Sequence, residues 1–254
     1  MRSCADTELR QIPGPTTLAP LVFLHEGLGS VAMWQGRAGD WPAQVCQAAG
    51  RAGWVYSRRG YGQSAAIPDV RGNGRLGADY MHREAWEVLP SLLKNWGIEK
   101  PVLIGHSDGA TIALLHAARL SVAGCVVTAP HLMVEEMTIS AIQAAKQAFE
   151  EGDLRQKLMR YHADVDCAFW QWNDVWLSPA FLNFDIREEC QAITAPLLAL
   201  QGVDDAYGSL RHLNELLTAG TVERHVLQDC GHSPHKDQAQ KSLELVVGFL
   251  AGLA

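Results

Sequence analysis

One serine in the sequence lies in a setting that could make it a nucleophile. Ser107 is the centre of the sequence GHSDG, which follows an apolar run at 101–104 and precedes an Ala- and Leu-rich run at 110–120. A serine at a tight strand-to-helix turn presents its hydroxyl at the end of the strand, and flanking glycines let neighbouring chain pass close by. Structural turns can also match five such residues, but the strand and helix predicted on either side favour a catalytic turn.

A histidine and a carboxylate later in the chain could activate this serine. A serine hydroxyl is a weak nucleophile until a neighbouring base takes its proton. His232 lies in the sequence DCGHSPH, and Asp204 and Asp205 follow an apolar run that ends in a glycine. Only one of these adjacent carboxylates can point at His232, so the acid is either Asp205 or Asp204. Because each group follows its own predicted strand, the sequence predicts that Ser107, His232 and an aspartate meet at one edge of a sheet.

The elements that must position these residues alternate regularly. Short apolar runs predict strands, and apolar stripes at helical spacing predict helices between them. The predicted strands are residues 21–24, 54–57, 101–104, 124–128, 196–201 and 224–227, and the predicted helices are residues 78–96, 110–120 and 242–253. This alternation predicts an α/β fold with a mostly parallel central sheet flanked by helices. The first twenty residues fit either a short edge strand or a disordered segment.

The pattern changes between residues 131 and 189, where helical segments replace the strands and aromatic residues crowd together. An insertion of this length after a core strand is typical of a helical lid over a ligand pocket, although an extra helical layer with its own aromatic core would look similar. We therefore divide the chain into a core, residues 1–130 and 190–254, and a lid insertion, residues 131–189. The predicted pocket residues are Leu28, His131, Trp170 and Trp176.

These motifs resemble those of the α/β-hydrolase family. The resemblance covers nearly everything from residue 21 to the carboxyl terminus except the predicted lid. The sequence GHSDG resembles the family's nucleophile elbow, GVDD (residues 202–205) its acid turn, and GHSPH (residues 231–235) its histidine loop.

The resemblance implies a role for each matching residue. By position, the nucleophile is Ser107, the general base is His232 and the acid is Asp205, while the backbone amides of Gly27 and Asp108 form the oxyanion hole. It implies no cofactor and no metal.

The chain departs from the family pattern at two positions. Glu26 stands where the family has glycine, and Ser57 stands where an acidic residue is common. An ionised carboxylate that pointed at the oxyanion would oppose catalysis. We therefore expect Glu26 to point away from it, toward Arg58 or Arg59.

The expected reaction is two-step acyl transfer, in which Ser107 forms an acyl-enzyme that water then hydrolyses. The aromatic insertion favours an apolar or aromatic substrate, so the leading prediction is a hydrolase of a small carboxylic ester. Thioesterases, lactonases, carbon–carbon bond hydrolases and cofactor-free haloperoxidases share the three residue types and stay as alternatives, whereas dehalogenases and epoxide hydrolases of this fold use an aspartate nucleophile. A protein that binds a small molecule without converting it is an alternative of another class, supported only by Glu26.

Composition sets the remaining expectations. The 254 residues carry a formal net charge of -7 with no block of Lys or Arg, which argues against nucleic acid or a membrane as partner. Six scattered cysteines, Cys4 among them, and the lack of a signal-like or membrane-spanning apolar run indicate reduced thiols in a cytoplasmic protein. His232 and His235 have no third partner at metal-binding spacing, so no metal site is predicted. The sequence does not indicate the oligomeric state.

Overall fold

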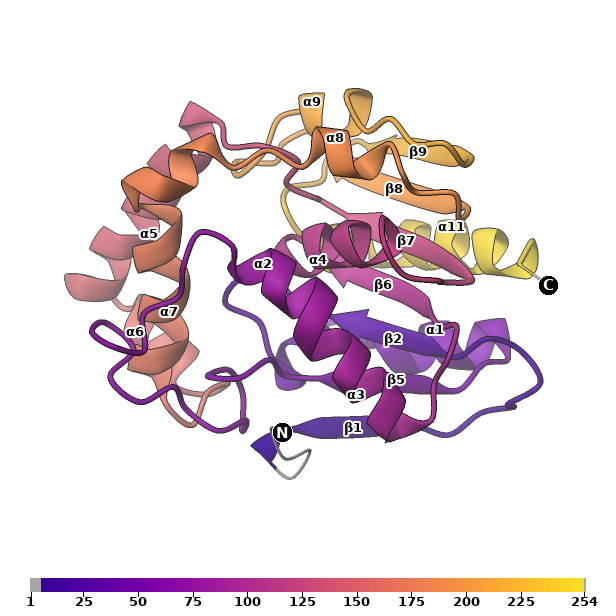
Figure 1. Cartoon of the computed structure of the whole chain (residues 1–254), viewed down its shortest axis with the longest axis horizontal. Helices are drawn as coiled ribbons and strands as arrows, with labels where there is room; N and C mark the ends of the chain where they lie inside the picture. The colour runs from indigo at the N-terminus through magenta and orange to yellow at the C-terminus, as the bar shows by residue number, and fades with distance from the viewer. Residues whose placement is uncertain (1–5, 254) are drawn as a thin grey trace.

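A seven-stranded sheet runs through the centre of the protein (Figure 1). The computed structural model describes residues 6–253. The strand order is β1-β5-β2-β6-β7-β8-β9, and every neighbouring pair is parallel except β1 with β5. The predicted α/β fold with a mostly parallel sheet is confirmed. Because the carboxyl ends of parallel strands share one edge, the loops that follow them open on the same side of the sheet.

Each predicted strand and helix agrees with the observed elements to within three residues at its ends, and further elements are present that the sequence did not predict. The strands are β1 (Leu9–Ile12), β2 (Leu21–Leu24), β3 (Gln35–Gly36), β4 (Gly39–Asp40), β5 (Gly53–Tyr56), β6 (Val102–His106), β7 (Gly124–Thr128), β8 (Leu197–Gly202) and β9 (Val222–Leu227). The helices are α1 (Trp41–Ala49), α2 (Tyr80–Arg83), α3 (Leu89–Trp96), α4 (Asp108–Ala117), α5 (Glu136–Glu150), α6 (Leu154–Leu158), α7 (Val165–Trp176), α8 (Arg187–Cys190), α9 (Arg211–Asn214), α10 (Pro234–Asp237) and α11 (Ala239–Ala251). The short strands β3 and β4 form a separate ribbon.

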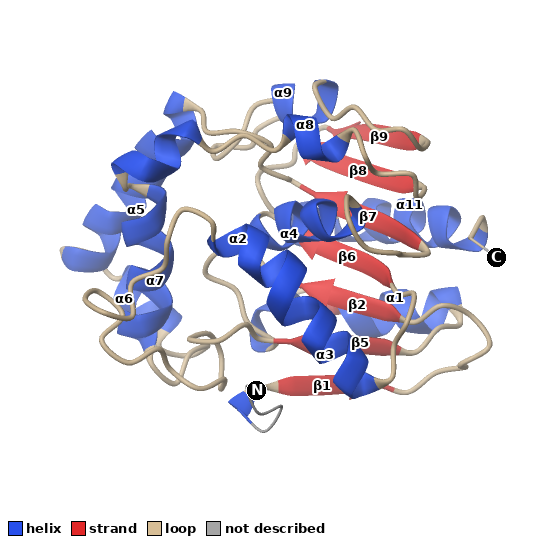
Figure 2. Cartoon of the chain, viewed as in Figure 1, coloured by secondary structure: helices blue, strands red, loops and turns tan. Residues whose placement is uncertain are grey.

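Apolar side chains cover both faces of the main sheet, as a sheet between two helical layers requires. In β2, Leu21 and Phe23 belong to one core and Val22 and Leu24 to the other, because successive strand residues point to opposite faces. Helices α3 and α4 cover one face, and α1 and α11 pack together on the other (Figure 2).

The predicted helix over residues 78–96 is interrupted in its middle. Helix α2 passes into a π-helical turn at Glu84–Val88, where the Leu89 N–H donates to the Glu84 carbonyl, before α3 continues. Pro90 has no N–H and its ring clashes with the carbonyl four residues earlier, so regular α-helical bonding cannot pass this point. Periodicity predicts the apolar stripe of this segment but not its change of pitch.

The amino-terminal segment forms an edge strand. β1 pairs antiparallel with β5, with Leu9 opposite Tyr56 and Ile12 opposite Gly53. Of the two alternatives that the sequence leaves open for the first twenty residues, the edge strand is observed in the described part, and residues 1–5 lie outside the described residues.

The segment between β7 and β8 is helical from α5 to α8. In Figure 1, α5, α6 and α7 form a separate layer at the carboxyl ends of the strands. The Asp164 carboxylate caps α7 by accepting the Cys167 N–H at 2.8 Å, and Phe169, Trp172 and Trp176 of this helix belong to the larger core. The exact division of the chain into core and lid stays a prediction.

Five cysteines of the described chain, Cys46, Cys125, Cys167, Cys190 and Cys230, are free and buried. Cys4 lies outside the described residues. Among residues 6–253, no helix combines the length and the apolar character that crossing a membrane requires.

One buried arginine links the carboxyl end of α11 to the segment before β2. Arg51, which is 1% exposed, donates from Nη1 to the Ala19 carbonyl (2.9 Å) and from Nη2 to the carbonyls of Leu250 (3.0 Å) and Leu253 (2.5 Å). Leu250 lies in the last turn of α11 and Leu253 follows that helix, so these bonds hold its carboxyl end. Arg51 therefore closes the end of α11 against the start of β2.

We expect Arg51→Met to lower the free energy of unfolding by about 3 kcal/mol, because it removes three charge-assisted hydrogen bonds. Urea unfolding followed by circular dichroism measures this change. The exposed Arg37 provides the matched control, Arg37→Met, which should change stability little. Equal stability of the two variants would mean that the Arg51 bonds contribute nothing net.

Candidate active site

The chain reverses direction at Ser107, between β6 and α4. Ser107 has φ 53° and ψ -119°, a conformation that residues with a Cβ rarely adopt, and its N–H donates to the Thr128 carbonyl at 2.9 Å. A Cβ on Gly105 would lie 2.3 Å from the Gly109 carbonyl oxygen, and a Cβ on Gly109 would lie 2.0 Å from that of Leu24. Both glycines are therefore required by close backbone contact, as the motif predicts.

The structure places Asp205, and not Asp204, against His232. His232 Nδ1 lies 2.9 Å from each carboxylate oxygen of Asp205, which is buried, whereas Asp204 is exposed. The same carboxylate accepts Gln201 Nε2 at 2.6 Å and the Tyr207 N–H at 2.8 Å. Because this contact engages Nδ1, it leaves Nε2 of His232 as the basic nitrogen.

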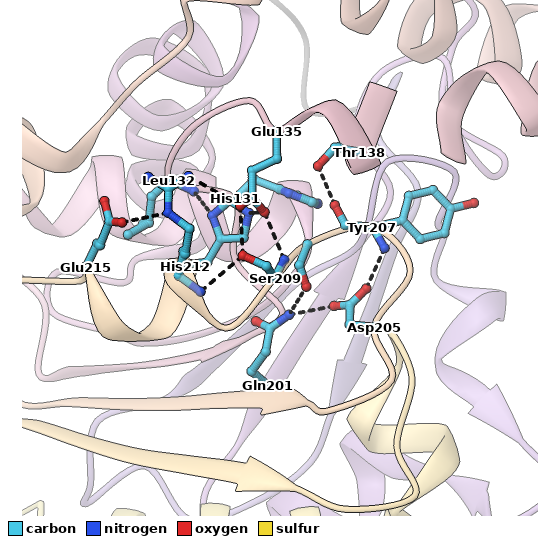
Figure 3. A network of polar contacts seen from close by, with 12 residues as sticks. His131, Leu132, Glu135, Thr138, Gln201, Asp205, Tyr207, Ser209, His212 and Glu215 are labelled. Carbon is cyan, nitrogen blue, oxygen red and sulfur yellow. Dashed lines mark hydrogen bonds and ion pairs between the residues drawn. The ribbon is translucent and has the colours of Figure 1, made fainter. Parts of the chain in front are cut away.

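A second set of polar contacts fixes the loop that carries Asp205 (Figure 3). Glu135 accepts both the N–H (2.8 Å) and the hydroxyl (2.7 Å) of Ser209. His212 Nδ1 accepts the Leu132 N–H at 3.1 Å, so its ring proton is on Nε2, which faces the Glu135 carboxylate at 3.0 Å. The loop after β8 is thus anchored to the segment after β7.

Ser107 and His232 line a cavity of about 120 Å³. Its walls carry Leu28, His131, Ile142, Trp172, Trp176 and Tyr207. The neutral form of His131 is favoured here, because burial, followed by the neighbouring His212 and His232, lowers its pKa well below the usual value.

Three of the four predicted pocket residues, Leu28, His131 and Trp176, line this cavity, but Trp170 does not. Trp170 instead packs edge-on against Phe149 and carries the Arg71 guanidinium 3.7 Å above its ring. Trp172 takes its place in the cavity. Trp172 and Trp176 are four residues apart and share one face of α7, a spacing that would have separated them from Trp170 in the sequence.

A buried chain of polar groups links the nucleophile turn to α7. The Asp108 carboxylate accepts the Tyr80 hydroxyl at 2.6 Å, and the Tyr80 oxygen accepts the Trp176 indole N–H at 2.9 Å. Burial raises the pKa of Asp108, although Arg58 Nη2 lies 3.9 Å away and acts in the opposite direction. The side chain after the nucleophile is therefore held by the fold while its backbone N–H begins α4.

The predicted pairing of Glu26 with Arg58 or Arg59 is wrong. Arg58 donates to the backbone carbonyls of His25 (2.5 Å) and Glu26 (2.9 Å), and Arg59 is exposed. Arg58 is buried among backbone acceptors, so its guanidinium is already occupied on the main-chain side of this loop.

The Glu26 carboxylate instead faces two groups of the neighbouring elements. It lies 3.4 Å from His106 Nδ1 and 3.7 Å from Lys236 Nζ, and His106 Nε2 lies 2.7 Å from the His232 carbonyl oxygen. Burial opposes ionisation of Glu26, but Lys236 and His106 outweigh it and hold the pKa of this carboxyl well below its usual range. Glu26 therefore connects the loop after β2 to the loop of the candidate base.

At the second departure from the family pattern, Ser57, a carboxylate from the segment before β1 contacts the serine. Glu8 accepts the Ser57 hydroxyl at 2.6 Å and the Gln63 N–H at 2.9 Å, and the Ser57 oxygen accepts the Val31 N–H at 2.9 Å. No sequence motif identifies Glu8, because it acts through a partner 49 residues away.

The two predicted oxyanion donors lie beside the cavity. Gly27 and Asp108 both line it, and within residues 6–253 neither backbone amide has an acceptor. The Asp108 amide is also at the amino terminus of α4, where the helix dipole favours negative charge. Their role as oxyanion donors stays a prediction.

No group of three or more His, Cys, Asp or Glu residues in the described part of the chain could hold a metal ion. His235, considered above as a partner of His232, packs its ring 4.9 Å from that of Trp34 and 5.7 Å from that of Trp41. Burial, the largest effect, lowers the pKa of His235 well below its usual value.

Comparisons with known proteins agree with this architecture. A relative, the sn-1-specific diacylglycerol lipase ABHD11 of Mus musculus, is 24% identical over 283 residues, which cover 97% of this chain and 88% of the relative. Among solved structures, the esterase EaEST from Exiguobacterium antarcticum has a TM-score of 0.75 at 18% identity, covering 97% of this chain and 96% of the esterase. The enol-lactonase from Burkholderia xenovorans LB400 has a TM-score of 0.71 at 18% identity, with 96% of each chain covered.

The model of the alpha/beta hydrolase family matches residues 21–244, which is most of the chain and includes every residue of the candidate triad. The chain therefore belongs to the alpha/beta hydrolase family and is, as an enzyme, a hydrolase.

Proposed function

We propose that this chain hydrolyses a small carboxylic ester with an apolar or aromatic part, through an acyl-enzyme on Ser107. The observation that carries the proposal is the contact of His232 Nδ1 with both oxygens of Asp205, beside the strained turn that presents Ser107 to the same cavity. No metal ion or cofactor is needed for this chemistry.

Each group has one task in the proposed reaction. His232 Nε2 takes the proton of Ser107 as its oxygen attacks the ester carbonyl, while Asp205 holds the imidazole tautomer and stabilises its charged form. The amides of Gly27 and Asp108 bind the oxygen that becomes negative. His232 then protonates the leaving alcohol, and water repeats the cycle to release the acid.

The ester class is supported by the names of the similar proteins, which include an esterase, a lipase and an enol-lactonase. A lactone is a cyclic ester, so lactone hydrolysis would need no new group in the site. Thioester and carbon–carbon bond hydrolysis use the same triad and stay as alternatives. Binding without turnover is the alternative of another class, and turnover that depends on Ser107 separates it from the rest.

The size of the cavity limits the substrate. A volume of about 120 Å³ suits a short acyl group better than a long chain. Walls of Leu28, Ile142, Trp172 and Trp176 favour an apolar group.

We expect Ser107→Ala to lower kcat on p-nitrophenyl butyrate about a million-fold and Asp205→Asn to lower it about ten-thousand-fold, since the triad acts as a unit. The neighbouring Asp204 offers a matched control, because Asp204→Asn removes an exposed carboxylate that does not contact His232. Steady-state kinetics on the purified variants measure these changes. Activity that survives in Ser107→Ala would disprove the proposed nucleophile.

A second expectation concerns acyl length. We expect kcat/KM for p-nitrophenyl butyrate to exceed that for the decanoate about tenfold or more, because the extra methylenes have no wall to fill in the cavity. A panel of p-nitrophenyl esters from acetate to palmitate measures this. A preference for the long esters would mean that the cavity described here is not the acyl site.

A third expectation concerns the charge of Glu26. Lys236→Met should lower kcat about threefold with little change in KM, because it leaves the Glu26 carboxylate less compensated beside the oxyanion loop. Adding Glu26→Gln should restore part of this loss, since the uncompensated charge is then gone. Kinetics at low and high salt test this, with Lys241→Met, an exposed lysine of α11, as the control. A double variant worse than Lys236→Met would contradict charge compensation.

A further inference from the structure

The cavity contains an indole N–H that has no acceptor. Trp172 lies on α7, lines the cavity and is 6% exposed, and its Nε1 donates to no group of residues 6–253. One turn further along the same helix, the Trp176 Nε1 donates to the Tyr80 hydroxyl at 2.9 Å. A buried tryptophan usually finds a partner for its N–H, so the Trp172 donor is available to a ligand.

The location of this N–H, more than its lack of a partner, distinguishes Trp172. The indole nitrogens of Trp34, Trp41, Trp54 and Trp96 also lack an acceptor. These nitrogens are buried elsewhere in the protein, and none of the four residues lines the cavity. Trp172 shares the cavity with Ser107 and His232.

The Trp172 nitrogen lies directly against the oxyanion loop. A Cβ built on Gly27 would lie 2.3 Å from Trp172 Nε1 and 2.4 Å from its Cδ1, so any side chain at this position would displace the indole. Gly27 is the residue whose amide is the proposed oxyanion donor. The pyrrole part of the Trp172 ring, which carries the nitrogen, therefore packs against the loop whose amide would bind the developing negative charge.

We propose that the Trp172 indole N–H is a third donor to the oxyanion, alongside the amides of Gly27 and Asp108. This inference rests on the proposed acyl transfer at Ser107. The insertion between β7 and β8 would then supply a catalytic residue as well as walls for the cavity.

The structure holds this donor in place before substrate arrives, as oxyanion stabilisation requires. The Asp164 cap begins α7, and Asn173 Nδ2, next to Trp172, donates to the Ile142 carbonyl of α5 at 3.2 Å. The rings of Trp172 and Phe169 pack edge-on with centroids 6.0 Å apart. A preorganised donor costs no reorganisation when the charge forms.

Glu26 supplies a reason for a third donor at this site. Glu26 is next in sequence to Gly27, and its carboxylate lies 3.4 Å from His106 Nδ1 and 3.7 Å from Lys236 Nζ. A nearby negative charge weakens the binding of an oxyanion. An additional neutral donor strengthens that binding without adding a charge that the buried cavity would have to accommodate.

The test replaces Trp172 by phenylalanine, which keeps an aromatic wall and removes the N–H. We expect kcat on p-nitrophenyl butyrate to fall about thirtyfold with KM within twofold of the wild type, because the lost contact forms only in the transition state. Affinity for a trifluoromethyl ketone, which forms an oxyanion when Ser107 adds to it, should fall by a similar factor. Trp170→Phe on the same helix, outside the cavity, is the matched control.

Two results would overturn the proposal. Unchanged kcat and ketone affinity in Trp172→Phe would make Trp172 a wall only, and a higher KM with unchanged kcat would make it a contact to the ground-state ester. If Trp172→Phe does not fold, the indole ¹H–¹⁵N spectrum of the wild type takes its place. One of the eight indole signals, assigned to Trp172 by triple-resonance experiments on the wild type, should then move downfield when the ketone binds, and an unmoved signal would overturn the proposal.

Failure of the proposed function gives a different result. Labelling of Ser107 by a fluorophosphonate and addition of the ketone need a reactive serine but no particular substrate. A wild-type protein that reacts with both and hydrolyses no ester would disprove the ester proposal, while the ketone affinity of Trp172→Phe would still decide the role of Trp172.

Discussion

The reversal of the chain at Ser107 is the constraint on which the arrangement at the carboxyl edge of the sheet depends. A positive φ at a residue with a side chain is unfavourable, so contacts with neighbouring residues must stabilise it. The Thr128 carbonyl accepts the Ser107 N–H, and Gly105 and Gly109 allow the close backbone contacts that a side chain would block. Parallel strands satisfy this because β2, β7 and β8 all end around the same point. The loops that carry Gly27, Asp205 and His232 then have only one region in which they can meet.

Local patterns predict most of this architecture, because strand ends and motif glycines are determined by residues close in sequence. Ser107, Asp205 and His232 follow from their motifs and from the strands that precede them. Contacts over long sequence separations are different. The position of Glu8 beside Ser57 depends on how edge strand β1 pairs with β5, which periodicity does not predict. The partner of Glu26 depends on how α10 packs. Composition marks an aromatic segment without indicating which face of a helix each ring occupies, so it predicts Trp170 as a pocket residue although Trp172 lines the cavity instead.

The two departures from the family pattern share a physical explanation. A carboxylate stands where the family has glycine, and a serine stands where an acidic residue is common; in each case side chains from other elements contact the position. Lys236 and His106 face Glu26, and Glu8 places a carboxylate against the Ser57 hydroxyl. Each of these groups therefore has its charge or hydrogen-bond partner in an element distant in sequence.

The contact between Gly27 and the Trp172 ring has a consequence for how such a protein can change over evolutionary time. A larger residue in the loop after β2 would collide with the indole, and a smaller residue on α7 would leave a void beside the loop. The two positions should therefore co-vary, although 145 residues separate them along the chain (172 minus 27). Exchanging the whole insertion for that of a distant relative would disturb the edge of the central sheet unless this loop were exchanged with it.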